Sequence, residues 1–252
     1  MVRHFLELLW EITKKELQVR YKHIVFGFLW LIANPLMQML VIGFVFPLFI
    51  KEPVKHYYYY LFAGLLAWNF FSLSLSKATQ SIVFERSLIK KAVFPRMVIP
   101  ISIVLSNLIN FVIAFILFLI PVSFLQTLSV ASAFYFLLGL TLLIIFTVGV
   151  TLLASSLNVK FRDINFFVQA ILIVWFYATP VMYSLSQLPE RFYWIWHLNP
   201  LTSIFQLIQA ALVGSVPPEP SMMLANFTTI IIVGILGVVT FLKESKDFDD
   251  WL

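Results

Sequence analysis

The sequence predicts an all-α polytopic membrane protein, in which residues 1–252 form a single transmembrane domain. Of the 252 residues, 61% are hydrophobic and 12% are charged, whereas soluble domains carry about 25% charged residues. The mean hydropathy is +0.96. Asp, Glu, Lys and Arg are absent from 23–50 and from 97–159, and a spanning helix needs about 20 apolar residues.

The N-terminal segment, 1–22, is predicted to be an amphipathic helix at the cytoplasmic face of the membrane. At 100° per residue, Phe5 and Ile12 share a broad apolar face, while Glu11 and Lys15 lie on the charged face as a favourable i,i+4 pair. Such a helix is typical of a membrane interface. A helix docked on another protein surface is the alternative.

Six transmembrane helices are expected, because the apolar runs divide into segments of spanning length. The 63 uncharged residues from 97 to 159 are too many for one span and fit two. The expected spans are 25–50, 57–76, 98–121, 131–157, 164–184 and 221–242, and the fifth is expected to be broken by Thr179-Pro180. This arrangement places 14 of the 17 Lys and Arg residues on one side. The positive-inside rule then puts both termini in the cytoplasm.

The start of the first span combines cations, an aromatic ring and a kink. Arg20 and Lys22 precede it, Trp30 lies a turn or two inside, and Asn34-Pro35 places a polar side chain and a helix kink within the membrane. This combination indicates a membrane port for an anionic molecule. A positive-inside anchor followed by an ordinary span is the alternative.

The segment 185–220 is rich in aromatic residues, and its longest apolar run is too short for a further span. Asn199-Pro200 is a good helix start. The apolar run 201–213 that follows has the length of a re-entrant or interfacial helix. We therefore expect re-entrant helices between spans five and six.

Catalytic patterns are missing from the sequence. There is no cysteine, the four histidines are scattered without metal-ligand spacing, and the expected spans contain no paired carboxylates. We therefore expect no metal site and no enzyme activity. The spans also lack the ionisable residues of ion-coupled carriers. No phosphate-binding loop is present, so an energy source must come from a partner. The loop 85–96, with a short helix-competent piece, is a candidate for coupling to that partner or, alternatively, a basic loop that only sets topology.

Five segments carry a resemblance to a known family: RYKHIVFGFLWLIANPL (20–36), SLIKKAVFPR (87–96), NVKFRDI (158–164), ATPVMYS (178–184) and LNPLTSI (198–204). In this order they resemble the membrane (permease) subunit of type-2 ABC polysaccharide exporters, most like the O-antigen exporters. Capsule and teichoic-acid exporters share the motifs.

The resemblance implies that two copies of the chain and an ABC ATPase dimer export a polyprenyl-pyrophosphate-linked polysaccharide across the bacterial inner membrane. ATP and Mg would then be bound by the ATPase, and this chain would hold no cofactor. Membrane lipid is a further partner, and nucleic acid is not. Six spans can hardly enclose a glycan-sized pore, so the channel is expected between the two copies.

Each part of this hypothesis has its own candidate residues. Substrate pyrophosphate docking is assigned to Arg20 and Lys22. Channel lining is assigned to Trp30, Asn34, Trp175, Tyr177 and Tyr183, because Trp and Tyr rings suit sugar faces and hydroxyls. ATPase coupling is assigned to Glu85, Arg86, Ser87, Leu88, Ile89, Lys90 and Lys91. The extracytoplasmic gate is assigned to Trp194, Trp196, Asn199 and Pro200. A stand-alone membrane enzyme or flippase acting on a lipid-linked sugar remains the alternative function.

Overall fold

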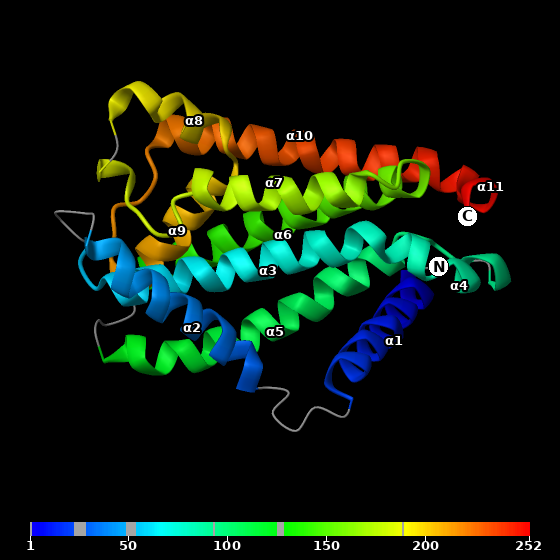
Figure 1. The fold of residues 1–252 in the computed structure, drawn as a ribbon, viewed down its shortest axis with the longest axis horizontal. Helices are drawn as coiled ribbons and strands as arrows, with labels where there is room; N and C mark the ends of the chain where they lie inside the picture. The colour runs from blue at the N-terminus through cyan, green and yellow to red at the C-terminus, as the bar shows by residue number, and fades with distance from the viewer. Residues whose placement is uncertain (1, 23–28, 49–53, 93, 125–128, 188) are drawn as a thin grey trace.

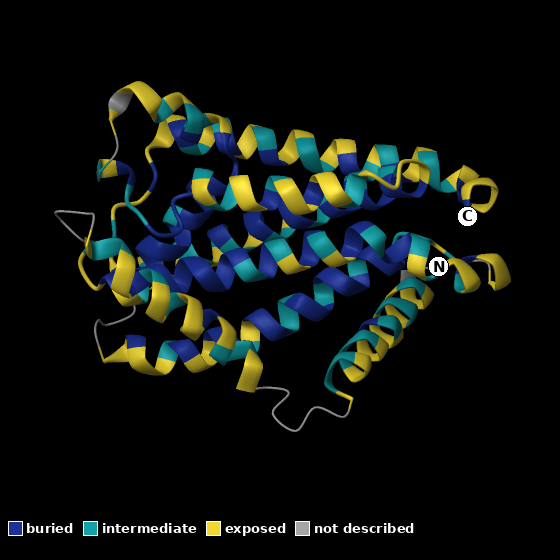
Figure 2. Cartoon of the chain, viewed as in Figure 1, coloured by how far each residue is buried: buried dark blue, intermediate teal, exposed yellow. Residues whose placement is uncertain are grey.

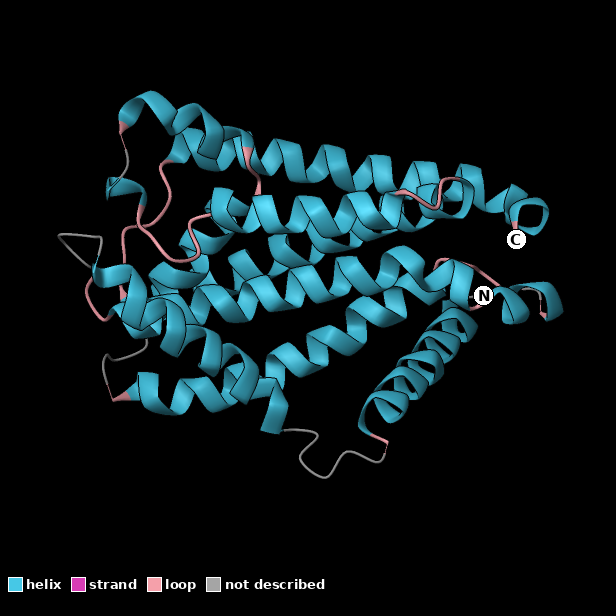
Figure 3. Cartoon of the chain, in the orientation of Figure 1, coloured by secondary structure: helices cyan, strands magenta, loops and turns pink. Residues whose placement is uncertain are grey.

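The computed structural model describes residues 2–22, 29–48, 54–92, 94–124, 129–187 and 189–252, and every regular element in these ranges is a helix (Figure 3). The longer helices are α1 (Val2–Tyr21), α2 (Leu29–Val45), α3 (Tyr57–Phe84), α5 (Val98–Ser123), α6 (Val130–Lys160), α7 (Ile164–Ala178), α9 (Leu201–Val213) and α10 (Pro220–Glu244). The shorter ones are α4 (Arg86–Lys91), α8 (Tyr193–Leu198), α11 (Phe248–Trp251) and the 3-10 turns η1 (Phe46–Leu48), η2 (Leu185–Gln187), η3 (Glu190–Phe192) and η4 (Ser245–Asp247). The all-α prediction is confirmed for this part of the chain.

The helices α2, α3, α5, α6, α7 and α10 run broadly along the long axis of the molecule, in alternating directions (Figure 1). Both ends of the chain lie at one end of this bundle, together with α4 and α11, and we call it the terminal end. The opposite end, where α8 and α9 lie, is called the far end. α1 packs obliquely beside α5 near the terminal end.

Among the described residues, five helical segments are long and apolar enough to cross a membrane: Leu29–Leu48, Tyr57–Phe84, Val98–Ser123, Val130–Lys160 and Pro220–Trp251. The second of these, α3, continues as a helix to Phe84, beyond the predicted span end at residue 76. Residues 25–28 and 49–50, the two ends of the predicted first span, lie outside the described residues.

The predicted fifth span, 164–184, is helical only as far as Ala178, so the helix ends at the predicted break, Thr179-Pro180. The resulting helix α7 has 15 residues, or about 22 Å at 1.5 Å per residue, which is short of a hydrocarbon core of about 30 Å. α7 ends because Thr179 precedes a proline, whose ring disfavours the helical conformation at the residue before it. Thr179 accordingly adopts extended backbone angles.

The hydrophobic core is centred on α3, which packs against α5, α6, α7 and α9. Most of its length is buried, whereas α2 and α10 expose much of their apolar surface (Figure 2). Large rings at the contacts between helices, such as Phe71 of α3, Phe146 of α6 and Phe205 of α9, are fully buried. Because α3 is central, its different faces border different neighbouring helices.

Helices α6 and α10 approach each other through glycine. A Cβ atom added at Gly237 would lie 2.1 Å from the Gly149 backbone oxygen, and one added at Gly149 would lie 2.7 Å from Gly234 Cα. Small residues at such a crossing let two membrane helices bring their backbones into contact. The α6–α10 contact therefore depends on the absence of side chains at these positions.

Helix α9 is short but deeply buried. Twelve of its 13 residues are buried, and it packs against α6, α3 and α10 at the far end. Gly214 ends the helix in the left-handed conformation, with φ of 66°, and its N–H donates to the Ala210 carbonyl. α9 thus forms part of the far-end core.

Candidate functional site

A polar groove of about 740 Å³ lies between α2, α3 and α7. Its polar side chains are Gln38 of α2, Asn69, Ser72 and Ser76 of α3, and Gln169 of α7. They lie on helices that are otherwise strongly apolar. Gln38 and Gln169 are exposed on the surface of the single chain.

Hydrogen bonds connect the polar side chains across this groove. Gln169 Nε2 donates to Ser76 Oγ at 2.6 Å, and Asn69 Nδ2 donates to Gln38 Oε1 at 3.4 Å. One turn beyond the groove, Gln80 Nε2 donates to Asn165 Oδ1 at 2.5 Å. The contributing positions 69, 72, 76 and 80 of α3 are three or four residues apart, which places them on one face of the helix. They form a continuous row of amides and hydroxyls along α3.

Aromatic rings complete the wall of the groove. Trp68, Phe166, Phe176 and Tyr177 line it, and Trp68 and Phe176 meet edge to face with centroids 5.3 Å apart. Tyr177 and Phe166 remain largely exposed. A surface that combines amides with aromatic faces is chemically suited to sugar rings, which present both hydroxyls and C–H faces.

Only one of the residues predicted to line a channel, Tyr177, lies in this groove. Trp30 and Asn34 are exposed on α2, outside the groove. Trp175 faces the core, where its ring meets Phe71 and Phe146 edge to face. The prediction missed Gln38 and the α3 row, although the helical spacing of polar residues in 69–80 carried the signal.

Asn199 joins the end of α7 to the start of α9. Its Oδ1 accepts hydrogen bonds from Trp175 Nε1 at 2.9 Å and from the Leu201 N–H at 3.2 Å. Its Nδ2 donates to the Ala178 carbonyl at 3.1 Å and to Thr179 Oγ1 at 3.0 Å. One buried amide therefore satisfies groups on both sides of the helix break and stabilises the start of α9 next to Pro200.

The segment after the break is held by side chains from α3 and α9. Tyr57 and Tyr60 donate to the Met182 and Tyr183 carbonyls at 2.9 Å, and Gln209 Nε2 donates to the Pro180 carbonyl at 3.2 Å. The non-helical backbone here is thus surrounded by protein donors, as irregular backbone at membrane depth requires.

The predicted gate residues lie at the far end but differ in exposure. Trp194 is 62% exposed, whereas Trp196 is buried and its Nε1 donates to Tyr183 Oη at 3.3 Å. Tyr183, predicted to line the channel, in turn donates to the Tyr177 carbonyl at 2.8 Å. These contacts tie α8 to the end of α7.

The two cations predicted to dock a pyrophosphate have different environments. Arg20 is half-buried and lines a small cleft between α1, α2, α3 and α5, while Lys22 is exposed. Beside Arg20, the Tyr21 hydroxyl donates to Asn110 Oδ1 at 2.8 Å. Burial raises the pKa of Tyr21, with the nearby Arg20 charge opposing this, so the hydroxyl keeps its proton as a donor.

Helix α4 protrudes at the terminal end and is anchored by one side chain. Arg86, Ser87, Lys90 and Lys91 are exposed, whereas Ile89 is buried in a cluster with residues of α3, α5, α6, α10 and α11. Glu85 accepts a hydrogen bond from Lys15 Nζ of α1 at 2.7 Å.

A second groove beside α4, of about 650 Å³, lies between α1 and the segment 85–94 and includes the half-buried Leu88. Ile89 therefore fixes α4 to the body of the protein, while its neighbours are available to a partner.

The apolar helices, with a polar groove at their depth, define a multi-pass helical membrane protein. The sequence profile of the ABC-2 type transporter family matches residues 7–213, from within α1 to the end of α9. The chain belongs to this family.

Relatives of known name extend over most of the chain. The chain is 33% identical to an O-antigen export system permease protein RfbA of Klebsiella pneumoniae, over 99% of this chain and 96% of the relative. Another protein of that name from the same organism is 38% identical, over 80% of this chain and 78% of its own length. A Myxococcus xanthus protein of that name is 32% identical, over 89% and 88% of the two chains.

Proposed function

We propose that this chain is the membrane-spanning subunit of an ATP-driven ABC exporter that moves a lipid-linked polysaccharide, of the O-antigen kind, across the bacterial inner membrane. The family match and the names of the relatives support the transporter class and the substrate class. ATP and Mg bind in a separate ATPase dimer. This chain contributes the path and the coupling surface.

The observation that carries the proposal is the polar groove between α2, α3 and α7. Gln38 and Gln169 are exposed on helices of membrane depth, and polar side chains at that depth face a bundle interior or a water-filled cavity rather than lipid. A second copy of the chain, placed against α2 and α7, shields these polar side chains from lipid. It leaves a polar path between the two copies. The amides and aromatic rings of this path hold a sliding glycan weakly at many points.

The proposed topology has six crossings with both termini in the cytoplasm. In the fifth crossing, α7 is completed by the segment 179–184, whose backbone is satisfied by donors from α3 and α9. The terminal end of the bundle is then cytoplasmic. The α8–α9 segment re-enters from the outer side and forms an extracytoplasmic gate with Trp194, Trp196, Asn199 and Pro200.

The terminal end meets the other partners in this proposal. α1 lies in the membrane interface, where its exposed Leu6 and Trp10 contact lipid. α4 and its exposed residues dock in the ATPase, while Ile89 transmits the movement to the bundle. Arg20 and Lys22 receive the pyrophosphate of the substrate, Arg20 inside its cleft and Lys22 at the solvent side.

Single-cysteine variants test the path, because the natural chain has no cysteine. Ser72→Cys and Gln169→Cys place a thiol in the groove, and Ile235→Cys places one on the exposed apolar face of α10. We expect a charged thiol reagent to modify the two groove variants in assembled transporter and to block export, while Ile235→Cys stays unmodified.

Groove thiols that react no faster than Ile235→Cys, with undisturbed export, would refute the path. A protein that processes lipid-linked sugar without any ATPase would instead establish the enzyme or flippase alternative.

A further inference from the structure

The Arg20 cleft contains two buried amides that are only half satisfied. Asn107 is 3% exposed and Asn110 is 6% exposed, and both line the cleft with Arg20. Asn107 Nδ2 donates to Ser74 Oγ at 3.2 Å and Asn110 Oδ1 accepts from Tyr21. Asn107 Oδ1 and Asn110 Nδ2 have no hydrogen-bond partner among the described residues. Buried polar atoms of this kind usually have a partner, so both atoms are available to a polar group that binds in the cleft.

The chemistry of the cleft favours an anionic oxygen. Asn110 offers an amide donor, and Asn107 offers one after rotation of its amide, because the Ser74 hydroxyl can donate as well as accept. Arg20 adds a planar set of charged donors that matches phosphate oxygens. Lys77 lies one turn beyond Leu73 of the cleft along α3 and lines a neighbouring pocket together with Glu16. Within the described ranges, no carboxylate lies at salt-bridge distance from Arg20 or Lys77.

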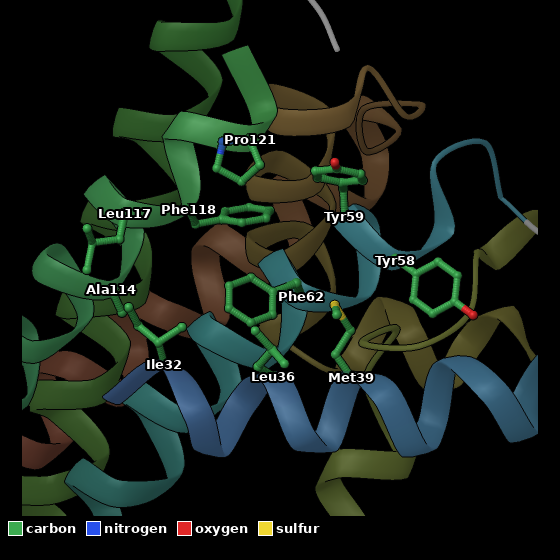
Figure 4. Close-up of a pocket in the computed structure, with 10 residues that line it drawn as sticks. All are labelled: Ile32, Leu36, Met39, Tyr58, Tyr59, Phe62, Ala114, Leu117, Phe118 and Pro121. Atoms are coloured by element: carbon green, nitrogen blue, oxygen red, sulfur yellow. The ribbon is translucent and has the colours of Figure 1, made fainter. Parts of the chain in front are cut away.

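An apolar groove continues from this cleft along α2, α3 and α5, three of the four helices that form the cleft. Its volume is about 340 Å³, and Ile32 and Leu36 of α2 face Phe62 of α3 and Leu117 and Phe118 of α5 across it (Figure 4). Ala114 lines both the cleft and the groove.

The cleft and the groove together match the depth of one leaflet of a bilayer. From Asn110 to Pro121, at the groove's far-end rim, α5 advances 11 residues, or about 16 Å. Half of a hydrocarbon core of about 30 Å is of the same length. The cleft and groove together have a charged, hydrogen-bonding head and an apolar tail of leaflet depth.

The cleft also touches the polar groove on the other side of α3. Asn69 and Leu73 line both the Arg20 cleft and the α2–α3–α7 groove. A group bound at Arg20 therefore has an apolar path on one side and a polar, aromatic path on the other. A diphosphate that joins one hydrocarbon chain to a glycan matches this arrangement, because the hydrocarbon chain suits the apolar path and the glycan suits the polar, aromatic path.

We propose that the seam between α2, α3 and α5 binds the lipid anchor of the substrate, with its diphosphate at Arg20, Asn107 and Asn110 and its polyprenyl chain in the apolar groove. This rests on the proposed function and assigns the anchor a place of its own beside the glycan path. A double-chained phospholipid fits less well, because the seam provides one apolar groove and its head opens toward a polar path.

The test measures lipid binding by native mass spectrometry of the purified full-length protein in detergent, with a long-chain polyprenyl diphosphate as probe. We expect Arg20→Gln to weaken binding at least ten-fold and Asn110→Leu at least three-fold. The matched control is Lys14→Gln, which removes a charge from the exposed face of the same helix and should bind as the natural chain does.

The tail is tested separately with Leu36→Trp, which fills the apolar groove from a position that is already 38% exposed. We expect this variant to lose affinity for the long-chain probe at least five-fold and to keep its affinity for short-chain geranyl diphosphate. The substitution adds bulk at an exposed position, so we expect the variant to fold. It therefore still tests the site if Arg20→Gln fails to fold.

Unchanged long-chain binding in Arg20→Gln and Leu36→Trp would overturn the site. Equal affinity for phosphatidylglycerol, with equal sensitivity to both substitutions, would overturn the assignment to a polyprenyl anchor. Because binding is measured without ATPase or glycan, a failure of this inference can be distinguished from a failure of the proposed function. Correct lipid binding by a protein that exports no glycan would refute only the proposed function, and normal export without seam binding would refute only this inference.

Discussion

At the scale of single residues, glycine allows α6 and α10 to touch. Because a Cβ at Gly237 meets the Gly149 backbone oxygen at 2.1 Å, even alanine forces the two helices apart. We predict that Gly237→Ala lowers the free energy of unfolding by about 1–3 kcal/mol, the range of overpacked cores.

The matched control for this change is Gly234→Ala, one turn away, where the added Cβ would be 3.7 Å from Ile145. Alanine favours a helix over glycine by about 1 kcal/mol, so this variant should be as stable as the natural chain or more so. Thermal unfolding in detergent compares the two, and equal melting temperatures would contradict the close contact.

Asn199 carries a second residue-scale prediction, since its amide bonds to four groups around the α7–α9 junction. Asn199→Ala leaves the half-buried Trp175 N–H without its acceptor, and an unsatisfied buried group costs about 1–3 kcal/mol. We expect a lower melting temperature together with a blue-shifted or broadened Trp emission. Leu198→Ala, at a neighbouring residue that is 68% exposed, should change neither, and an equal loss in both variants would contradict the role of the amide.

At the scale of elements, α4 combines a buried residue that anchors it, Ile89, with exposed residues that are available to a partner. Lys90→Glu with Lys91→Glu reverses two exposed charges, so the chain should fold normally and lose affinity for its ATPase about ten-fold or more. Ile89→Asp should instead unfold the terminal end, because it places a charge at a side chain that is 4% exposed. Co-purification with the ATPase and thermal unfolding distinguish the two effects, and normal assembly and export by the double variant would remove α4 from the interface.

The helices themselves were predictable, whereas their exact ends were less so. Long uncharged runs predicted the apolar helices because hydropathy reports directly on burial in lipid. The break at Thr179-Pro180 was predicted within the fifth span, but a proline can either kink a membrane helix or end it, so the sequence alone did not decide that α7 ends at Ala178. The hydrogen bonds from Tyr57, Tyr60 and Gln209 that decide between these outcomes come from residues distant in the chain.

At the scale of the whole molecule, the candidate site could be predicted only in part. The sequence indicated Arg20, but the separation of Arg20 from Lys22 follows from how α1 packs on α5. Trp175 was expected in a channel because of its residue type, yet helix rotation turns it toward Phe71 and Phe146. The groove joins Gln38 with Gln169, 131 positions apart, and only tertiary packing creates it.

The central claim is that this chain, together with an ABC ATPase, moves a lipid-linked glycan across a membrane. The most direct test places both proteins in liposomes with a lipid-linked polysaccharide on the ATPase side. The amount of glycan on the opposite side is then measured with a membrane-impermeant lectin. The account predicts that glycan appears there only with ATP and only when both proteins are present. Glycan transfer without ATP, or its absence in a fully assembled complex that hydrolyses ATP, would contradict it.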